Sequence, residues 1–279
     1  MSTKKAYSQY IISLLLFGSN GIVASRIALT SYEIVFARTL IGSFFLALVF
    51  AASKQKLIAS GQKVQLFKNK KHLGYLVISG AALGTGWMFL YEAYRQIGVS
   101  IATLAYYCGP MIVMVLSPLL FRERIPLAKV PGILAVLLGM LLVNLNALSE
   151  GRTFWGLFCG IMSAVMYAIM VIFNKKAESI TGLFNSLVQL CISFLTVALF
   201  MGFRQGYSLH IEPGSIIPIL ILGIINTGIG CYLYFSSIGN LPVQTVAICG
   251  YLEPLSALIF STFFLGESLR VAGYFRCKR

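Results

Sequence analysis

Long apolar runs separated by short polar segments dominate the sequence. Each run is close to the roughly 20 residues that a helix needs to cross the hydrocarbon core of a bilayer. The predicted spans are Tyr7–Ser25, Glu33–Ala52, Leu73–Tyr94, Ser100–Phe121, Leu127–Asn146, Phe154–Phe173, Leu183–Phe203, Ser215–Ile238 and Pro242–Leu265. A tenth span begins over Glu267–Tyr274, shortly before the sequence stops at Arg279. The pattern therefore predicts an all-α integral membrane protein.

A short pattern occurs twice in these spans. The first copy, GPMIVMVLSPLLFRER, contains Pro110 and Glu123, and the second, EPLSALIFSTFFLGES, contains Pro254 and Glu267. Proline and glutamate are 13 residues apart in both copies (123 − 110 and 267 − 254), and the copies are 144 residues apart (254 − 110). This duplication predicts a first transmembrane repeat over 1–147 and a second over 148–279.

The basic residues of the loops are distributed unevenly between the two predicted sides of the membrane. One side carries Lys4, Lys5, Lys54, Lys56, Lys63, Lys68, Lys70, Lys71, Arg122, Arg124, Lys129, Lys175 and Lys176; the other carries Arg26, Arg95, Arg152, Arg204 and Arg270. Because basic residues collect on the cytoplasmic side, we predict a multi-pass protein of the cell membrane with a cytoplasmic N-terminus. With five spans in each repeat, the two repeats are expected to be inverted in the membrane.

Composition supports a membrane protein. The 279 residues are 58% hydrophobic and 11% charged, with a mean hydropathy of +0.86. Soluble domains carry about 25% charged residues, so most of this surface is expected to face lipid. The net charge of +14 follows from the cytoplasmic loops and does not indicate nucleic-acid binding. The six cysteines form no Cys-x-x-Cys pair, and we expect no metal and no cofactor.

Two charged residues inside the spans are candidates for function, because charge is costly there. Glu253 lies near mid-depth, directly before Pro254, which removes a backbone donor and frees a carbonyl. This arrangement suits recognition of a cation or an amine, or proton coupling; a structural glutamate held by a hydroxyl or an arginine is the alternative. Arg38 can bind a carboxylate or phosphate, pair with Glu253, or act as a snorkelling or helix-tying arginine.

Polar and aromatic residues at comparable depth complete the candidate substrate site. They are Trp87, Tyr91, Tyr107, Tyr232, Asn20 and Asn226, and each can line a cavity or form an interhelical hydrogen bond. Tyr94 and Tyr234, near span ends, are interpreted as interfacial anchors. The glycines of Gly84–Gly86 and Gly228–Gly230 are candidate bending points in two spans.

Several of these segments together resemble the EamA-type members of the drug/metabolite transporter (DMT) superfamily. The matching segments are FGSN in the first span, FARTLIG with Arg38, both proline-to-glutamate blocks, GILAVLLGMLLV and GLFCGIMSAVMYA. The resemblance covers nearly the whole chain. It implies a DMT-type fold of ten helices, arranged as two inverted five-helix repeats around a central cavity. It also implies transport of small metabolites, often export of amino acids or related compounds.

The sequence departs from the family pattern at its end. Where the family has a glycine followed by a full helix, this chain has Arg276 and stops three residues later (279 − 276). The expected fold is therefore nine full spans with a truncated tenth helix.

We predict a secondary transporter that works by alternating access, and two other function classes stay open. The truncated tenth helix leaves open a non-transporting membrane partner or pseudo-transporter. An intramembrane enzyme is disfavoured because the chain has no aspartate and places His72 and His210 in loops. The expected partners are a small-molecule substrate and the lipid bilayer, with protons as a candidate coupling ion and a second copy of the chain as a candidate homodimer partner.

Overall fold

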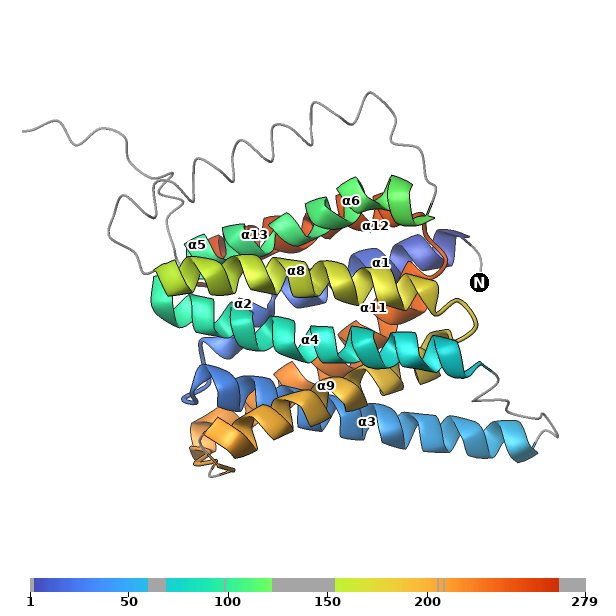
Figure 1. Ribbon diagram of the computed structural model, residues 1–279. Coiled ribbons are helices and arrows are strands. Elements are labelled where there is room, and N and C mark those ends of the chain that lie inside the picture. Colours follow the sequence, from blue (N-terminus) through green and yellow to red (C-terminus); the bar gives the residue numbers. More distant parts are fainter. Residues whose placement is uncertain are drawn as a thin grey trace, which may run out of the picture.

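The structure, a computed structural model, describes residues 3–59, 69–97, 99–121, 154–204, 206–207 and 209–265, and all regular elements in these ranges are helices (Figure 1). The α-helices are α1 (Thr3–Gly18), α2 (Asn20–Ala24), α3 (Ser31–Ala59), α4 (Lys70–Ile97), α5 (Val99–Tyr106), α6 (Cys108–Phe121), α8 (Phe154–Lys176), α9 (Gly182–Arg204), α10 (Ile216–Leu220), α11 (Gly230–Ile238), α12 (Val243–Gly250) and α13 (Leu252–Leu265). A short 3₁₀-helix, η2 (Pro213–Ser215), precedes α10, and a π-helix, η3 (Ile221–Ile229), joins α10 to α11.

Five segments of the described chain are each long and apolar enough to cross a bilayer as one continuous unit. They are Ser31–Lys54, Lys70–Ile97, Phe154–Lys176, Gly182–Arg204 and Pro213–Ile238. The predicted spans at 127–146 and after residue 266, together with Glu123 and Glu267, lie outside the described residues. The total of ten helices with nine full spans therefore stays a prediction.

Three spans that hydropathy predicts as continuous helices are each interrupted. The first breaks at Ser19 between α1 and α2, the fourth at Tyr107 between α5 and α6, and the ninth at Tyr251 between α12 and α13. Pro110 and Pro254 each follow a break by three residues (110 − 107 and 254 − 251). A proline in the first turn of a helix needs no backbone N–H, whereas the same proline in mid-helix would clash with the preceding turn. The duplicated proline accounts for the second and third breaks.

The span over Pro213–Ile238 contains a π-helix where the sequence indicated only a bending point. The wide turn of η3 is held by the Thr227 hydroxyl, which donates to the Leu222 carbonyl five residues earlier at 2.7 Å. The glycines of Gly228–Gly230 lie at its C-terminal end, so the predicted bending point falls where the π-helix passes into α11. The other predicted bending point, Gly84–Gly86, lies inside α4, which runs through it without interruption.

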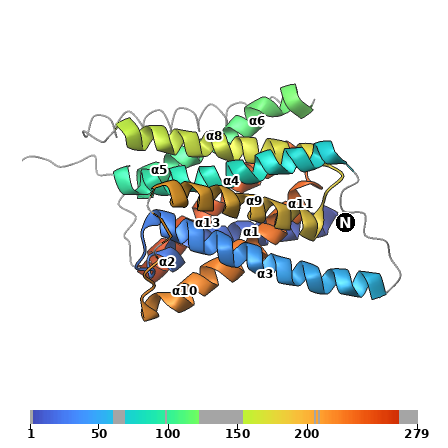
Figure 2. The same cartoon turned by 60° about the horizontal axis from the view of Figure 1, so that its bottom comes forward.

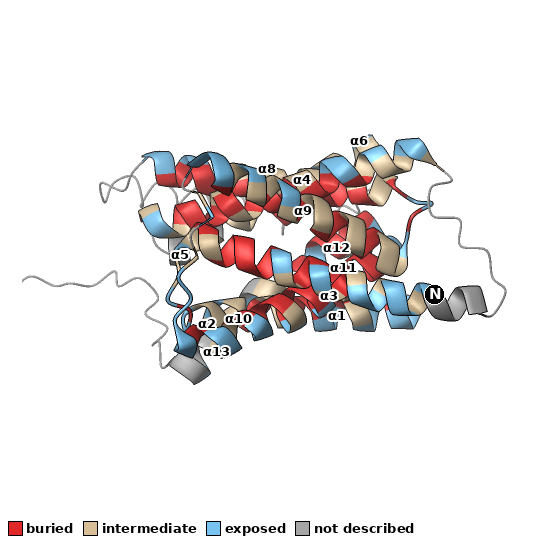
Figure 3. Cartoon of the chain, turned by 90° about the horizontal axis from the view of Figure 1, so that it is seen from below, coloured by how far each residue is buried: buried red, intermediate tan, exposed pale blue. Residues whose placement is uncertain are grey.

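The helices pack side by side with their long axes roughly along one direction (Figure 1, Figure 2). Helix α4 packs against α8 and α9, while α1 packs against α11 and α13. Helix α3 contacts α9 and η3, and α6 contacts α8 and α12. Buried residues gather where these helices meet, and exposed ones lie on the outside (Figure 3). Large apolar side chains are among the exposed ones, including Leu119 (80%) and Phe203 (91%), as expected for a surface in contact with lipid.

The two groups of basic residues lie at opposite ends of this bundle. Helices α3 and α8 end where α4 begins, at the same end as the N-terminus (Figure 1). Two contacts connect this end: the His72 Nδ1 atom lies 2.6 Å from the Ser179 hydroxyl, and the Lys175 ammonium donates to the Leu241 carbonyl. We call it the lysine end; its described basic residues are Lys4, Lys5, Lys54, Lys70, Lys71, Lys175 and Lys176. The opposite end, the arginine end, carries Arg26, Arg95 and Arg204.

Helices α1 and α13 approach each other closely at Gly18, which makes a first prediction possible. A Cβ added at Gly18 would lie 2.0 Å from the Ser256 hydroxyl and 2.9 Å from the Glu253 carbonyl oxygen. We expect Gly18→Ala to destabilise the protein by about 1–3 kcal/mol, the usual cost of overpacking. The measurement is thermal unfolding of the purified protein. Gly21→Ala is the matched control, because a Cβ there meets nothing within 4 Å; equal melting temperatures for the two variants would contradict the prediction.

Candidate functional site

The helix interruptions lie around a small, partly open space that we call the central cavity. Its volume is about 40 Å³, enough for a few water molecules, since one needs roughly 10–15 Å³. Its walls come from both predicted repeats. They are formed by Phe17, Asn20, Leu83, Trp87, Tyr106, Tyr167, Met170, Cys231, Tyr234, Phe235 and Glu253.

Glu253 contributes the carboxylate of the central cavity. It is the second residue of α13, directly after the break at Tyr251, so its negative charge lies in the favourable first turn of the helix. Among the residues that the structure describes, the carboxylate has no hydrogen-bond or ion-pair partner. Arg38 and Glu253 therefore form no ion pair in this conformation, although Arg38 is near enough to act on this carboxylate electrostatically.

Two further polar groups of the cavity lack partners within the described part of the chain. The side-chain oxygen of Asn20 is buried with no hydrogen-bond partner, and Asn20 is the first residue after the break at Ser19. The Tyr106 hydroxyl likewise has no described partner. With Glu253, the cavity thus offers several unpaired acceptors, which suits a ligand that donates hydrogen bonds. In the described ranges, no three His, Cys or Glu side chains gather as metal ligands would.

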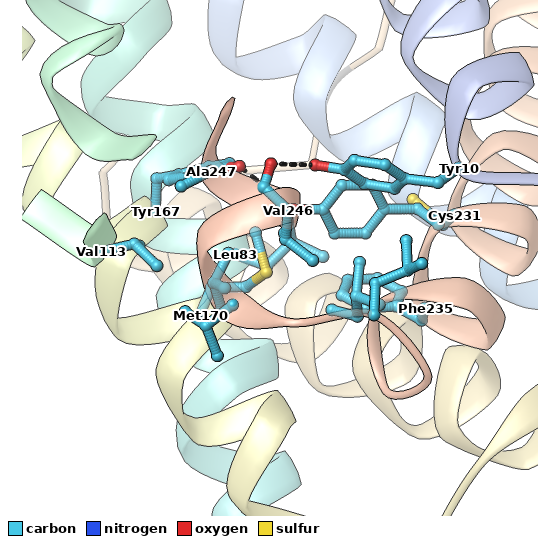
Figure 4. Packing of buried hydrophobic residues seen from close by; sticks show 14 of the residues in the cluster. Tyr10, Leu83, Val113, Tyr167, Met170, Cys231, Phe235, Val246 and Ala247 are labelled. Carbon is cyan, nitrogen blue, oxygen red and sulfur yellow. Dashed lines mark hydrogen bonds between the residues drawn. The ribbon is translucent and has the colours of Figure 1, made fainter. Parts of the chain in front are cut away.

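Tyrosine rings form much of the remaining wall. The rings of Tyr106 and Tyr167 are 5.6 Å apart, and the hydroxyls of Tyr167 and Tyr234 lie 3.2 Å apart. Behind them, the Tyr10 hydroxyl donates to the Val246 carbonyl at 2.7 Å (Figure 4). The interpretation of Tyr234 as an interfacial anchor is wrong, because only 3% of it is exposed. Its place among apolar residues with no basic neighbour was the available signal that it is buried.

Arg38 lies behind the cavity wall. Its side chain is 2% exposed, and its Nε atom donates to the Thr227 hydroxyl at 2.9 Å. The guanidinium lies 4.4 Å from the ring centre of Trp87, a cation–π contact, and one of its nitrogens is 3.5 Å from the Tyr91 hydroxyl. Its Nη2 atom is buried with no described partner. Trp87 thus contacts Arg38 while also lining the cavity.

Asn226 supports the break in the first span. Its side-chain amide donates to the Leu16 carbonyl and to the Ser19 hydroxyl, both at 2.8 Å. The Leu16 carbonyl also accepts hydrogen bonds from the Ser19 backbone N–H at 3.1 Å and from the Ser19 hydroxyl at 2.7 Å, so Asn226 ties this local turn to η3. Asn226 therefore has a structural role in this conformation.

Tyr107 is also held at a helix break. Its carbonyl accepts a hydrogen bond from the Tyr251 hydroxyl at 3.3 Å, and the two residues are 144 positions apart (251 − 107), the same offset as the two prolines. Of the eight predicted site residues, Glu253, Asn20 and Trp87 line the cavity. The other five, which do not line it in this conformation, are Arg38, Tyr91, Tyr107, Tyr232 and Asn226.

Comparison with known proteins gives a consistent result. The model of the EamA-like transporter family matches residues 4–145 and 154–275. The protein named uncharacterized transporter YxxF of Bacillus subtilis (strain 168) is 26% identical over 264 residues, which cover 94% of this chain and 82% of that protein. The uncharacterized inner membrane transporter YicL of Salmonella typhimurium is 24% identical over 272 residues, covering 96% and 89%.

A solved crystal structure has the same fold. It superposes with a TM-score of 0.73 at 16% identity, covering 94% of this chain and 89% of that chain. At this level of identity, the likeness concerns the fold alone.

The contacts of Arg38 lead to a second prediction. We expect Arg38→Lys to destabilise the protein by about 1–2 kcal/mol, because an ammonium cannot stack on Trp87 and donate to Thr227 at the same time. Thermal unfolding of the purified variant measures this loss. Arg26→Lys, at an exposed position of the arginine end, is the control and should unfold like the wild type. A melting temperature of Arg38→Lys equal to that of the control would show that the planar guanidinium is not required.

Proposed function

The chain belongs to the EamA-like transporter family, and from this premise we propose that it is a secondary transporter that moves small metabolites by alternating access through the central cavity. Membership of the family, with relatives named as transporters, points to a membrane transporter and not to an enzyme. The route, the substrate, the direction and the coupling are the parts that we propose.

The observation that carries the proposal is the unpaired carboxylate of Glu253 in a partly open space inside the helix bundle. A glutamate with a purely structural role would be expected to accept hydrogen bonds, since an unsatisfied charge away from water is costly. A carboxylate that faces a cavity without a protein partner is instead available to a ligand or to a proton. The unpaired Asn20 oxygen beside the same cavity supports this interpretation.

The contacts between helices support two equivalent repeats, for which we propose an inverted orientation and a boundary near residue 147. If the first five spans correspond in order to the last five, α4 is equivalent to α11, and α1 is equivalent to α8. The contact between α4 and α8 is then equivalent to the contact between α11 and α1. The contact of α4 with α9 then corresponds to that of η3 with α3, and α6 with α12 is a contact between equivalent spans. The breaks at Tyr107 and Tyr251 also occupy equivalent positions. We therefore retain the division into repeats 1–147 and 148–279 and the ten-helix arrangement.

Alternating access requires a conformation other than this one. Sites for small molecules usually have volumes of about 300–1,000 Å³, whereas the central cavity measures about 40 Å³. We interpret the described state as closed around the site. The interruptions at Ser19, Tyr107 and Tyr251 and the π-helix are places where segments of a span can reorient without bending a regular helix.

The lining of the cavity favours a substrate with an amino group. A carboxylate and several aromatic rings around one small space can hold an ammonium by charge and by cation–π contacts. Amino acids and related compounds fit this description, and export is the direction that we propose. Protons are the proposed coupling ion, because protonation of Glu253 would compete with binding of a cation.

The third prediction tests the role of Glu253. In proteoliposomes, Glu253→Gln should abolish the response of transport to a pH gradient and reduce uptake of an amine-bearing substrate at least tenfold. The glutamine keeps the size of the side chain but carries neither the charge nor a titratable proton. Glu212→Gln, at an exposed loop position, is the matched control and should transport like the wild type.

Two outcomes would contradict the proposal in different ways. Unchanged pH-dependent transport by Glu253→Gln would exclude proton coupling through this residue. Absence of transport by the wild type, with amino acids, amines and other small metabolites all tested, would favour the non-transporting partner.

A fourth prediction concerns orientation in the membrane. If the lysine end is cytoplasmic, green fluorescent protein fused after Glu178 should fluoresce, and alkaline phosphatase fused after His210 should be active. The reciprocal fusions should be silent, because each reporter functions on only one side of the membrane. The opposite pattern would reverse the orientation inferred from the lysines.

A further inference from the structure

A second, larger cavity lies at the arginine end and is separate from the central one. Its volume is about 500 Å³, and its walls are Tyr32, Thr85, Met88, Phe89, Glu92, Trp155, Cys159, Thr196, Phe200 and Arg204. Helix α4 forms its floor, while α8 and α9 form its two sides. We call this space the flank groove.

The flank groove and the central cavity lie on different faces of α4. Leu83 and Trp87 face the central cavity, whereas Thr85, Phe89 and Glu92 face the groove. Leu83 and Trp87 are four residues apart, and Thr85, Phe89 and Glu92 follow one another at spacings of four and three. Residues at these spacings share one side of a helix, so each set lies on its own side of α4. The groove is therefore not an extension of the proposed substrate site.

The sides of the groove carry apolar residues that point outward. On α8, Trp155 is 51% exposed, and on α9, Leu199 is 61% exposed and Phe203 is 91% exposed. These exposed residues belong to two of the segments that are long and apolar enough to span a bilayer. Lipid is therefore the medium that the groove meets at its sides.

The polar end of the groove has a surplus positive charge. Glu92 is fully compensated: it is ion-paired with Arg95 at 3.2 Å and accepts hydrogen bonds from Tyr32 at 2.6 Å and Gln96 at 2.9 Å. Arg204, the last residue of α9, has no hydrogen-bond or ion-pair partner in the described part of the chain. With the charge of Glu92 balanced, Arg204 is the group left to attract an anion.

We propose that the flank groove binds one phospholipid with an anionic headgroup. The lipid phosphate lies against Arg204 at the arginine end, and one acyl chain runs along Met88, Phe89 and Phe200. From Glu92 to Thr85, the groove follows seven residues of α4 (92 − 85), which is about 10 Å at 1.5 Å per residue. This is the order expected of an amphipathic ligand: charge at the end of the bundle and apolar contact toward its middle. The volume also falls within the range usual for bound small molecules.

The test uses the fact that the chain has two tryptophans, of which Trp155 lines the groove and Trp87 lines the central cavity. The full chain is reconstituted in phosphatidylcholine vesicles that contain a small fraction of brominated phosphatidylglycerol or, in a parallel series, of brominated phosphatidylcholine. Bromine quenches tryptophan fluorescence on contact. The quenching by brominated phosphatidylglycerol, divided by the quenching by brominated phosphatidylcholine, therefore reports the preference for the anionic lipid. The Trp155→Phe variant, which retains Trp87, supplies the signal to subtract.

We expect this quenching ratio at Trp155 to be about five in the wild type. A basic residue near an anionic surface contributes about 1 kcal/mol, which corresponds to a factor of about five. Arg204→Ala should reduce this ratio to about one. Arg26→Ala, which removes a charge at the same end but outside the groove, should leave it unchanged. Equal quenching by the two lipids in the wild type, or a preference that survives in Arg204→Ala, would overturn the proposal.

A second pair of variants tests the acyl-chain part of the groove. Thr196→Phe fills the groove, and the lost hydroxyl only donates to the Ile192 carbonyl of its own helix. Leu195→Phe adds an aromatic ring to the neighbouring residue, which is 52% exposed and lies outside the groove. We expect quenching of Trp155 to fall at least twofold in Thr196→Phe and to stay unchanged in Leu195→Phe. Unchanged quenching in both variants would overturn the placement of the acyl chain. A free fatty acid that competes with the anionic phospholipid would instead identify the occupant as a fatty acid.

Discussion

The backbone of a membrane protein must find its hydrogen-bond partners within the protein, and the rest of this structure depends on that constraint. Hydrocarbon offers no water to a free carbonyl, so a helix can be interrupted only where protein or a cavity receives it. The interruption of the first span is stabilised by Asn226, which donates to Leu16, and that of the fourth span by Tyr251, which donates to Tyr107. Because such partners must come from neighbouring helices, the interruptions gather inside the bundle, and the central cavity lies among them.

Two glutamates inside the helix bundle differ in how the protein compensates their charge. Glu92 has three partners that donate to it or neutralise it, whereas the carboxylate of Glu253 has none among the described residues. Glu92 is 6% exposed and Glu253 is half-buried, so the more deeply buried acid is the one with partners. What differs is whether the protein itself has compensated the charge. That difference is why the proposed site is built on Glu253 and not on Glu92.

Much of this arrangement could be predicted from the sequence, and the remainder depended on contacts between distant segments. Hydropathy predicted the five segments that are long and apolar enough to span a bilayer, and the cost of burying a charge drew attention to Glu253, which lines the central cavity. Hydropathy could not locate the helix breaks, because an interrupted span is as apolar as a continuous one. Asn20 and Asn226 look alike in the sequence, yet one lines the cavity with a free oxygen and the other supports a break. The sequence left several roles open for Arg38, and the contact of its guanidinium with the Trp87 ring could not be read from any of them.

The hydrogen bond between Tyr251 and Tyr107 joins two equivalent positions of the proposed repeats, and it runs in one direction only. The side chain of Tyr251 donates to the carbonyl of Tyr107, and no reciprocal bond is present among the described residues. If the halves exchange conformations, the mirror-image bond, from the Tyr107 hydroxyl to the Tyr251 carbonyl, replaces it. The two end states would then be nearly equal in energy at this contact, so breaking the bond would add to the barrier between them without favouring either state.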